Sequence, residues 1–398
     1  MKDIEMLFNA NRSTKYTMRN NLNKNILEIE ITATKNMFTG MQIEQIINII
    51  NYAHSKYGKL KYSVYFYLGN VMFIDKLTYV FLECICYYLI ERYGHPVQVF
   101  MHVRMDIGTE GINSSPLLLL NGTKMDKIRL YPSKFKFDIY EYHFRRLING
   151  VNKIDTNYLG NLYEEIDSFL KRFSINDECR DEVGHVITEL VGNAAEHAHA
   201  DCLIDIDVAP NYQKYKGNKL VDDSYYYGIN IAVINFSSKL LGDDIEANIL
   251  QNSEIRETSD RYNYVLRAYE NHRKQFSKYY TKNDFCNITA FQKKISGRPE
   301  KEATGGTGLP VLIKSLEEKS EKHQCYVISG NRCVNFYENL LEYDNDGWIS
   351  FSSENNYLEN IPGEDVVAEC LIYMPGTAYN FNFIMKGEPI NEKNIVKI

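Results

Sequence analysis

The sequence predicts an α/β N-terminal domain with a mixed sheet, followed by an α+β C-terminal domain whose helices are layered on one mixed sheet. Three observations lead to this prediction. The chain has 398 residues, whereas a single domain usually has roughly 100–200. Strand and helix patterns alternate in the first quarter of the chain, as expected for a partly parallel sheet. The second half begins with helical patterns and continues with strand patterns, which is typical of α+β domains.

The first half is predicted from its hydrophobic spacing. A strand is expected where apolar and polar residues alternate, and a helix where isoleucines recur three and four residues apart before Gly58. Further along, a β-rich run precedes a short strand that leads into an apolar helix ending near Gly94. The expected order is strand, helix, strand, short strand with helix, and strand, over residues 26–34, 41–58, 62–68, 69–96 and 97–103.

The middle of the chain is less regular. Residues 108–116 are a loop by composition, and residues 134–151 are expected to form a strand that turns into a short helix. The domain boundary is placed here. The predicted division is an N-terminal domain, a connecting segment and a C-terminal domain, over residues 1–125, 126–155 and 156–398.

The C-terminal domain is expected to open with two helices, at residues 156–173 and 177–199. Asp205 and Asp207 alternate with apolar residues, so their strand is predicted to have one face in water. A polar region at 243–295 has mostly helical propensity. The strands are predicted at residues 202–210 and 227–236, in a hairpin of 325–330 with 333–340, and at 377–385.

The composition excludes several classes of protein. A net charge of −7 argues against nucleic acid as the main ligand, because neutralising phosphates requires a basic face. The eight cysteines contain no CxxC pair, which argues against a zinc knuckle and favours free thiols in a reducing cytosol. No signal-peptide core is evident, and the longest apolar run, 77–90, contains Glu83 and is too short to span a bilayer. A cytoplasmic protein that does not bind membranes is therefore expected.

The stretch ELVGNAAEHAHA, residues 189–200, is unusually polar for a helix. Glu189, Asn193 and His197 stand four residues apart and are expected to share one face. An amide oxygen can ligate Mg²⁺, and a carboxylate can take a proton from an attacking water or hydroxyl. A solvated polar face is the alternative explanation, and this helix alone does not decide between the two.

The second motif is a glycine loop that opens a helix. It comprises Thr304, Gly305, Gly306, Thr307, Gly308 and Leu309, followed by Pro310. Glycines let backbone N–H groups approach a ligand closely, and the N-terminus of a helix favours an anion. The loop matches neither a Walker A motif nor a complete GxGxxG motif, and an ordinary turn would look similar.

Together and in this order, the two motifs resemble the GHKL, or Bergerat, ATP-binding fold of DNA gyrase, sensor histidine kinases and anti-sigma-factor serine kinases. The resemblance covers roughly residues 156–390, and Gly376-Thr377-Ala378-Tyr379-Asn380-Phe381 is similar to the family's terminal G-T-x-F strand. It implies an ATP site with Mg²⁺, beside which His197 is a candidate for contacting phosphate. Asn193 matches the family's Mg²⁺-binding asparagine, Glu189 its general base, and Gly305, Gly306 and Gly308 the glycines that contact phosphate.

One motif departs from the family pattern. The family's D-x-G-x-G box places an aspartate against the adenine amino group, whereas Asn235 and Ser237 stand at the corresponding Asp and first Gly positions. Asparagine can still accept a hydrogen bond, but it lacks the charge that strengthens one. The Ser237 side chain, in place of the glycine, would narrow an adenine pocket. Adenine recognition is thus the part of the resemblance that these residues put in question.

The resemblance also implies a lid over the nucleotide, at residues 243–303. Basic residues lie just before the glycine loop and are candidates for contacting the γ-phosphate. A solvated lid surface is the alternative. These residues are Lys293, Lys294, Arg298 and Lys301.

The first half looks like a STAS domain around residues 73–76, where a short strand precedes the long apolar helix. In the anti-sigma antagonists of that class a serine at the helix start is phosphorylated. Lys76 occupies the matching place, so Thr78 is the nearest substitute. A generic α/β partner domain explains the pattern equally well. His143 is the one candidate for a phosphoacceptor histidine, and a packing or surface role is the simpler explanation for it.

Three functions remain open. The first is a Mg²⁺-dependent ATPase switch that binds ATP or ADP and acts on a protein partner or on its own homodimer. The second is an anti-sigma-type serine/threonine protein kinase, which would use the same Glu189 and Asn193. The third is an interaction module that has lost nucleotide binding, which Asn235 and Ser237 favour.

Overall fold

The computed structural model describes most of the chain, with gaps between the described stretches. These stretches are residues 3–9, 25–31, 37–58, 60–101, 115–122, 125–150, 156–173, 175–212, 215–216, 219–220, 225–252, 260–293, 295, 309, 313–314 and 320–387. Within them the protein combines helices with both parallel and antiparallel sheets. Among the described helices, none combines the length and the apolar character needed to cross a bilayer.

The N-terminal half is built on a three-stranded parallel sheet. Its strands run in the order β1 (Ile26–Glu30), β3 (Ser63–Gly69) and β5 (Val97–Met101). The short strands β2 (Met37–Phe38) and β4 (Met72–Phe73) also pair in parallel. The expected mixed sheet is therefore wrong for the described strands. Helices α2 (Gly40–Tyr57) and α3 (Lys76–Tyr93) separate the sheet strands, and such crossovers return the chain in the same direction.

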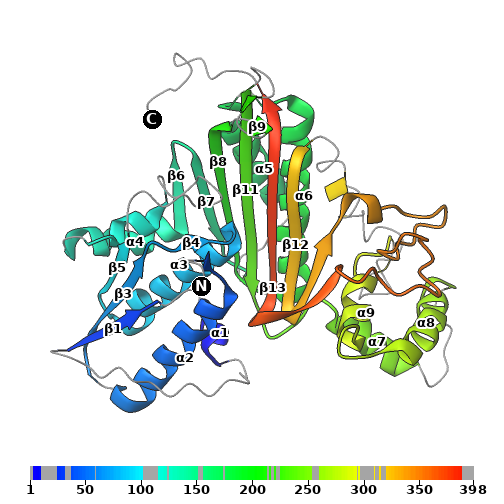
Figure 1. Ribbon diagram of the computed structural model, residues 1–398, viewed down its shortest axis with the longest axis horizontal. Coiled ribbons are helices and arrows are strands. Elements are labelled where there is room, and N and C mark those ends of the chain that lie inside the picture. Colours follow the sequence, from blue (N-terminus) through cyan, green and yellow to red (C-terminus); the bar gives the residue numbers. More distant parts are fainter. Residues whose placement is uncertain are drawn as a thin grey trace.

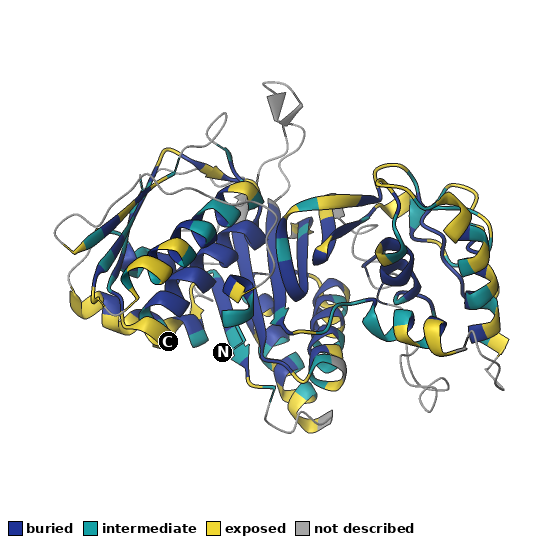
Figure 2. Ribbon diagram, turned by 90° about the horizontal axis from the view of Figure 1, so that it is seen from below, coloured by how far each residue is buried: buried dark blue, intermediate teal, exposed yellow. Residues whose placement is uncertain are grey.

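The two helices begin and end where the sequence predicts. Thr39 caps α2 in a capping box with Gln42, and Asp75 caps α3 by accepting from the Thr78 backbone N–H at 2.7 Å. Gly94 ends α3 in the left-handed conformation. Every residue of α3 from Lys76 to Leu89 is buried, so this helix is covered on all sides except at its last turn (Figure 2).

The middle segment forms a helix and then a hairpin, the reverse of the predicted order. Helix α4 (Met125–Lys136) is followed by β6 (Phe137–Tyr140) and β7 (His143–Ile148). The prediction failed because the alternation of Lys and Phe at 134–137 resembles a strand. Phe135 instead belongs to an apolar helical stripe with Ile128 and Tyr131. Since β6 and β7 join the C-terminal sheet, residues 126–155 do more than connect the two halves.

The C-terminal half is built on a six-stranded sheet, which stands at the centre of the molecule (Figure 1). Its order is β12 (Ser320–Phe336), β13 (Val367–Gly387), β11 (Tyr225–Phe236), β8 (Cys202–Tyr212), β7 and β6. Every neighbouring pair is antiparallel, so the prediction of a mixed sheet is wrong here too. Two helices, rather than one, lie between β7 and β8, and they bring the chain back in the opposite direction.

The hairpin predicted over residues 325–330 and 333–340 is instead one strand as far as Phe336, and a 3-10 turn follows at Glu338–Leu340. Gly330 has a φ of +60°, which permits a bulge, and both parts of β12 pair with β13. Beyond the bulge, odd- and even-numbered side chains of β12 point to the opposite faces of the sheet from those before it. Val327 packs toward the helices of the C-terminal half before the bulge and Val334 does so after it, whereas Ile328 and Cys333 pack toward the N-terminal half.

The sheet is covered on both faces. Helices α5 (Thr156–Lys171) and α6 (Asp177–Asn193) cover one face, and α3 packs against β11 and β13 from the other. Residues of β11 alternate between the two sides. Ile229, Ile231 and Val233 pack in the core under α5 and α6, and Ala232, Ile234 and Phe236 pack with the N-terminal half.

Helices α7 (Asp243–Asn252), α8 (Asp260–His272) and α9 (Lys282–Thr289) lie at the opposite end of the molecule from the N-terminal half (Figure 1). They confirm the helical prediction for residues 243–295. Trp348 stacks between Tyr264 and Tyr357 beside them, with ring centroids 4.6 Å and 5.2 Å away. The remaining elements are α1 (Glu5–Asn9), η3 (Pro116–Leu120), η4 (Ala194–Ala198), β9 (Tyr215–Lys216), β10 (Lys219–Leu220), η5 (Arg273–Gln275) and η7 (Glu338–Leu340).

Candidate functional site

The candidate site lies where β11 and β13 meet, on the face covered by α6. Asn235 of β11 pairs with Thr377 of β13 in the antiparallel register. The Thr377 backbone N–H donates to Asn235 Oδ1 at 3.1 Å. Two segments singled out separately in the sequence, the altered D-x-G-x-G box and the G-T-A-Y-N-F strand, are therefore in direct contact.

Gly376 makes this contact possible. Its φ is +96°, in the region that favours glycine. A Cβ atom there would lie 2.3 Å from the Asn235 carbonyl oxygen and 2.7 Å from the Ser237 backbone nitrogen. No side chain fits into such a space, so the glycine of the terminal motif is required for the two strands to approach.

Two serines tie this end of the sheet together. The Ser237 hydroxyl is buried and accepts from the Lys239 backbone N–H at 2.8 Å. Ser329 of β12 donates its hydroxyl to the Gly376 carbonyl at 2.7 Å and accepts from the Leu241 N–H at 2.9 Å. Both hydroxyls therefore serve the local backbone, and Ser237 acts as a turn residue.

Glu189 lies on α6 over the same face of the sheet. It is half-buried and lies close enough to Tyr343 and Tyr379 to act on both hydroxyls. Burial raises the pKa of each tyrosine, and the Glu189 carboxylate raises each pKa further. Tyr379 follows Thr377 by two residues on β13 and shares its face. Glu189 and Asn235 therefore lie on the same face of the sheet.

The regular helix changes character just after Glu189. Asn193 is exposed and is the last residue of α6, and the π-helical turn η4 follows it. His199 then ends the turn with a φ of +49°. Single π-helical turns are frequent at functional sites. Glu189 and Asn193 stand one helical turn apart as predicted, while the side chain of His197 lies outside the described residues.

The glycine loop and most of the predicted phosphate contacts fall outside the described residues. This applies to Lys294, Arg298, Lys301, Thr304, Gly305, Gly306, Thr307 and Gly308. Leu309 is described and buried in the core with Ile313, so its side chain packs rather than faces solvent. Lys293 is half-buried, with its Nζ 4.6 Å from the centre of the Tyr343 ring. Lys293 therefore lies against the tyrosine whose pKa the Glu189 carboxylate raises.

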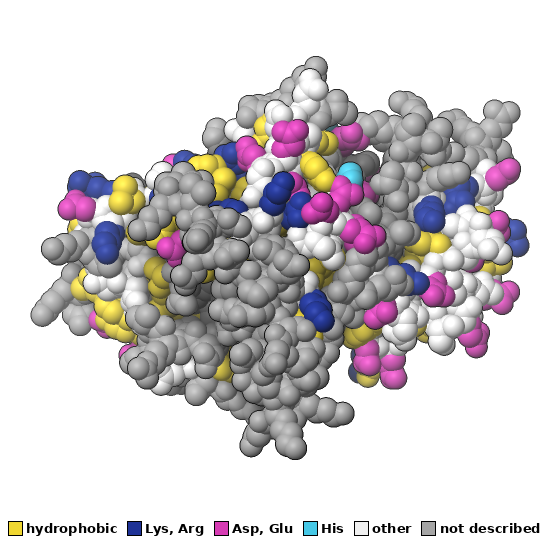
Figure 3. Space-filling model, turned by 90° about the horizontal axis from the view of Figure 1, so that it is seen from above, with side chains coloured by type: hydrophobic (Ala, Val, Ile, Leu, Met, Phe, Trp, Pro, Cys, Tyr) yellow, Lys and Arg dark blue, Asp and Glu magenta, His cyan; other side chains and the backbone are white. Residues whose placement is uncertain are grey.

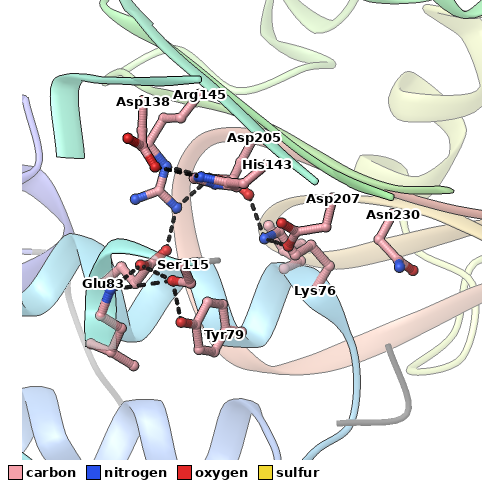
Figure 4. A network of polar contacts seen from close by, with 12 residues as sticks. Lys76, Tyr79, Glu83, Ser115, Asp138, His143, Arg145, Asp205, Asp207 and Asn230 are labelled. Atoms are coloured by element: carbon pink, nitrogen blue, oxygen red, sulfur yellow. Dashed lines mark hydrogen bonds and ion pairs between the residues drawn. The ribbon is translucent and has the colours of Figure 1, made fainter. Parts of the chain in front are cut away.

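A second polar cluster lies on the opposite face of the sheet, where the sequence predicted water. Asp205 and Asp207 of β8 are buried, and the Lys76 ammonium of α3 contacts both carboxylates (Figure 4). The Arg145 guanidinium of β7 contacts Asp205 and also Glu83 of α3. The predicted wet face is wrong, because these carboxylates meet cations of the N-terminal half and of the neighbouring strand.

This buried ionic network, comprising Lys76, Glu83, Asp138, His143, Arg145, Asp205 and Asp207, includes a possible metal-binding arrangement. Ligand atoms of His143, Asp205 and Asp207 lie within 4.8 Å of one another. Burial alone would lower the pKa of His143, but Asp205 and Asp207 raise it to about 9. A protonated histidine and the Lys76 ammonium already neutralise these carboxylates, so the geometry fits ion pairing better than a metal ion.

The two positions that the STAS resemblance compares with a phosphorylated serine, Lys76 and Thr78, are buried between the N-terminal and C-terminal halves. Lys76 is 2% exposed and paired with the aspartates, and Thr78 is 6% exposed at the first turn of α3. Asn380 of β13 accepts from the Leu77 N–H at 3.2 Å beside them. A kinase could not reach Thr78 while the two halves are packed together.

No family model, curated protein or solved structure matches this chain.

On the face shown in Figure 3, the lysine and arginine side chains of the described residues lie among aspartates and glutamates.

Proposed function

We propose that the C-terminal half is a GHKL-type nucleotide-binding domain and that the protein is a Mg²⁺-dependent nucleotide switch, with ATP as the ligand implied by the resemblance. The observation that carries the proposal is the contact between Asn235 and Thr377. It joins two family-like motifs at one point, on the same face of the sheet as Glu189. Gly376 adds a close backbone approach that other residues would block.

The chain's residues would divide the work as follows. Asn193, exposed at the end of α6, would supply an amide oxygen to Mg²⁺, which supplies charge neutralisation for phosphates. Glu189 would accept a proton from the attacking water. Lys293, which lies against the Tyr343 ring, would contact the γ-phosphate, and the glycine loop would cradle phosphate.

The switch would act through the parts that flank the site. Residues 243–303, which contain α7, α8 and α9, would form the lid. The N-terminal half, which we propose to be STAS-like, packs on the sheet face opposite α6. β8 and β11 have side chains in the core under α5 and α6 and in the core shared with the N-terminal half. A structural change on nucleotide binding would therefore reach the contact between the two halves through a single layer of strands. A partner protein or a second copy of the chain in the cytoplasm would bind differently before and after that change.

Isothermal titration with Mg²⁺ and nucleotide tests the proposal. We expect binding by the wild type, and a loss of at least about tenfold in affinity in Asn193→Ala, because a metal ligand is removed. Glu189→Gln should bind nucleotide but hydrolyse it about a hundredfold more slowly. Glu178→Gln changes an exposed carboxylate in the first turn of the same helix and serves as the matched control.

The fate of the γ-phosphate separates the remaining functions. Release as free phosphate supports the ATPase switch, and transfer to a protein side chain supports the anti-sigma-type kinase. If no purine nucleotide binds at millimolar concentration in the presence of Mg²⁺, the proposed function is wrong and the chain is a nucleotide-free interaction module.

A further inference from the structure

The hydrogen bond between Asn235 and Thr377 fixes the orientation of the Asn235 amide. A backbone N–H can only donate, so the Asn235 atom 3.1 Å from the Thr377 nitrogen must be the acceptor Oδ1. Nδ2, with its two N–H groups, then points away from Thr377. Turning the amide over would place two donors against each other and lose this bond.

The Asn235 side chain lies on the side of the sheet that carries the candidate site. Asn235 follows Val233 by two residues on β11 and therefore lies on the α6 side of the sheet. The side chain is only partly buried, and no described residue accepts a hydrogen bond from Nδ2. The nearby Ser237 and Ser329 hydroxyls are already bonded to backbone groups. At this position the site thus offers a ligand two donors.

The polarity of this group matters because purines differ at position 6. Adenine carries an amino group there, which donates, whereas guanine and hypoxanthine carry a carbonyl oxygen, which accepts. An aspartate held by Thr377 in the same way would present a second acceptor oxygen and suit adenine. Asn235 presents a donor instead. The Thr377 hydroxyl can rotate to donate or accept, so by itself it favours neither class of purine.

We propose that the site selects a 6-oxopurine nucleotide, such as GTP, over ATP, with Asn235 as the specificity-determining residue. This inference rests on the proposed function, because it concerns the base end of the same site. A donor facing the adenine amino group leaves both groups without a partner, which should weaken ATP relative to GTP by about tenfold or more.

The test is a titration of the full-length protein with the Mg²⁺ complexes of GTP, inosine triphosphate and ATP. Inosine triphosphate has the 6-carbonyl but lacks the 2-amino group of guanine, so it isolates the contact at position 6. We expect GTP and inosine triphosphate to bind at least about tenfold more tightly than ATP. Asn235→Asp should reverse the preference, because Oδ2 then accepts from the adenine amino group.

A charge control accompanies this variant. Ser238→Asp adds the same negative charge at an exposed position three residues along the chain and leaves the amide intact. It should keep the preference for GTP. A reversal in Ser238→Asp as well would overturn the hydrogen-bond explanation, because charge alone would then account for the effect.

The outcomes separate this inference from the proposed function. Binding of ATP as tightly as GTP by the wild type overturns the base preference and leaves the nucleotide switch standing. Failure of all three nucleotides to bind removes the proposed function itself. The wild-type comparison decides between these results even if Asn235→Asp does not fold.

Discussion

Arg145 on β7 and Glu83 on α3 form an ion pair in which neither side chain is exposed to solvent. Arg145 also contacts Asp205 on β8, so one guanidinium joins the N-terminal half to two strands of the C-terminal sheet. Charges in such a place are costly unless each one is paired. The contact between the two halves therefore depends on a set of side chains that must all be present together.

Replacing Arg145 with methionine should strongly destabilise the protein. The change leaves Glu83 buried without its cation and removes one of the cations that contact Asp205, which typically costs about 3–5 kcal/mol of unfolding free energy. Urea denaturation measures this loss. The control is Lys136→Met, whose partner Glu91 is exposed, and its cost should stay below about 1 kcal/mol. Equal small losses in both variants would show that the buried pair contributes nothing.

Stability should depend on pH through His143. Opposing carboxylates raise the pKa of this buried histidine from 6.5 to about 9, so the folded state holds its proton more tightly than the unfolded chain. The resulting stabilisation is complete below pH 6.5 and is lost as the pH rises through 9, a change of about 3 kcal/mol. Denaturation across this range should show the decline.

The histidine variant isolates this effect. In His143→Gln the unfolding free energy should lose this dependence on pH between 6.5 and 9. His185→Gln changes an exposed histidine and should keep the wild-type decline. If His143→Gln declines as steeply as the wild type, another group is responsible.

Gly376→Ala should damage the candidate site through the backbone. The added methyl group would meet the Asn235 carbonyl oxygen at 2.3 Å, in a conformation already unfavourable for alanine. We expect a loss of about 3 kcal/mol in unfolding free energy together with weaker nucleotide binding. Gly228→Ala on β11 is the matched control, because its Cβ would make an ordinary 3.5 Å contact with Ala209. Comparable melting temperatures for the two variants would contradict the argument.

Thiol labelling should distinguish one cysteine from the other seven. Cys370 is partly exposed, whereas the other cysteines are buried. Burial raises the pKa of Cys202 and Cys286 to about 12, which suppresses the reactive thiolate. A thiol reagent added to the native protein should modify one group rapidly, and Cys370→Ser should abolish that phase. Rapid modification of several thiols would show that the core opens readily.

Local patterns were sufficient to predict most helices and strands. The spacing of isoleucines in α2 and the Asp and Gly residues around α3 act within a few residues of each other, so the sequence displays them directly. The direction of strand pairing depends on how the chain returns to the sheet. That is why the mixed sheets and the hairpin at Gly330 were predicted wrongly.

The candidate site was predictable in part because its residues carry unusual chemistry for their positions. Glu189 and Asn193 stood out in a helix, and the glycine of the terminal strand stood out by type. The buried ionic network was missed because Asp205 and Asp207 alternate with apolar residues in the manner of a solvated strand. A pairing signal existed in Lys76 and Glu83, charged residues within an apolar helix, but their partners lie far away in the chain.

Between Tyr226 and Ile234 no residue of β11 faces water. Substitutions along this strand should therefore fall into two interleaved classes, one disturbing the helical layer above the candidate site and the other disturbing the seat of the N-terminal half. Alternate residues of this strand must fit two different neighbouring layers. Truncation between the two halves would expose every residue of one class at once, so the sheet and the layers on its two faces depend on one another for burial.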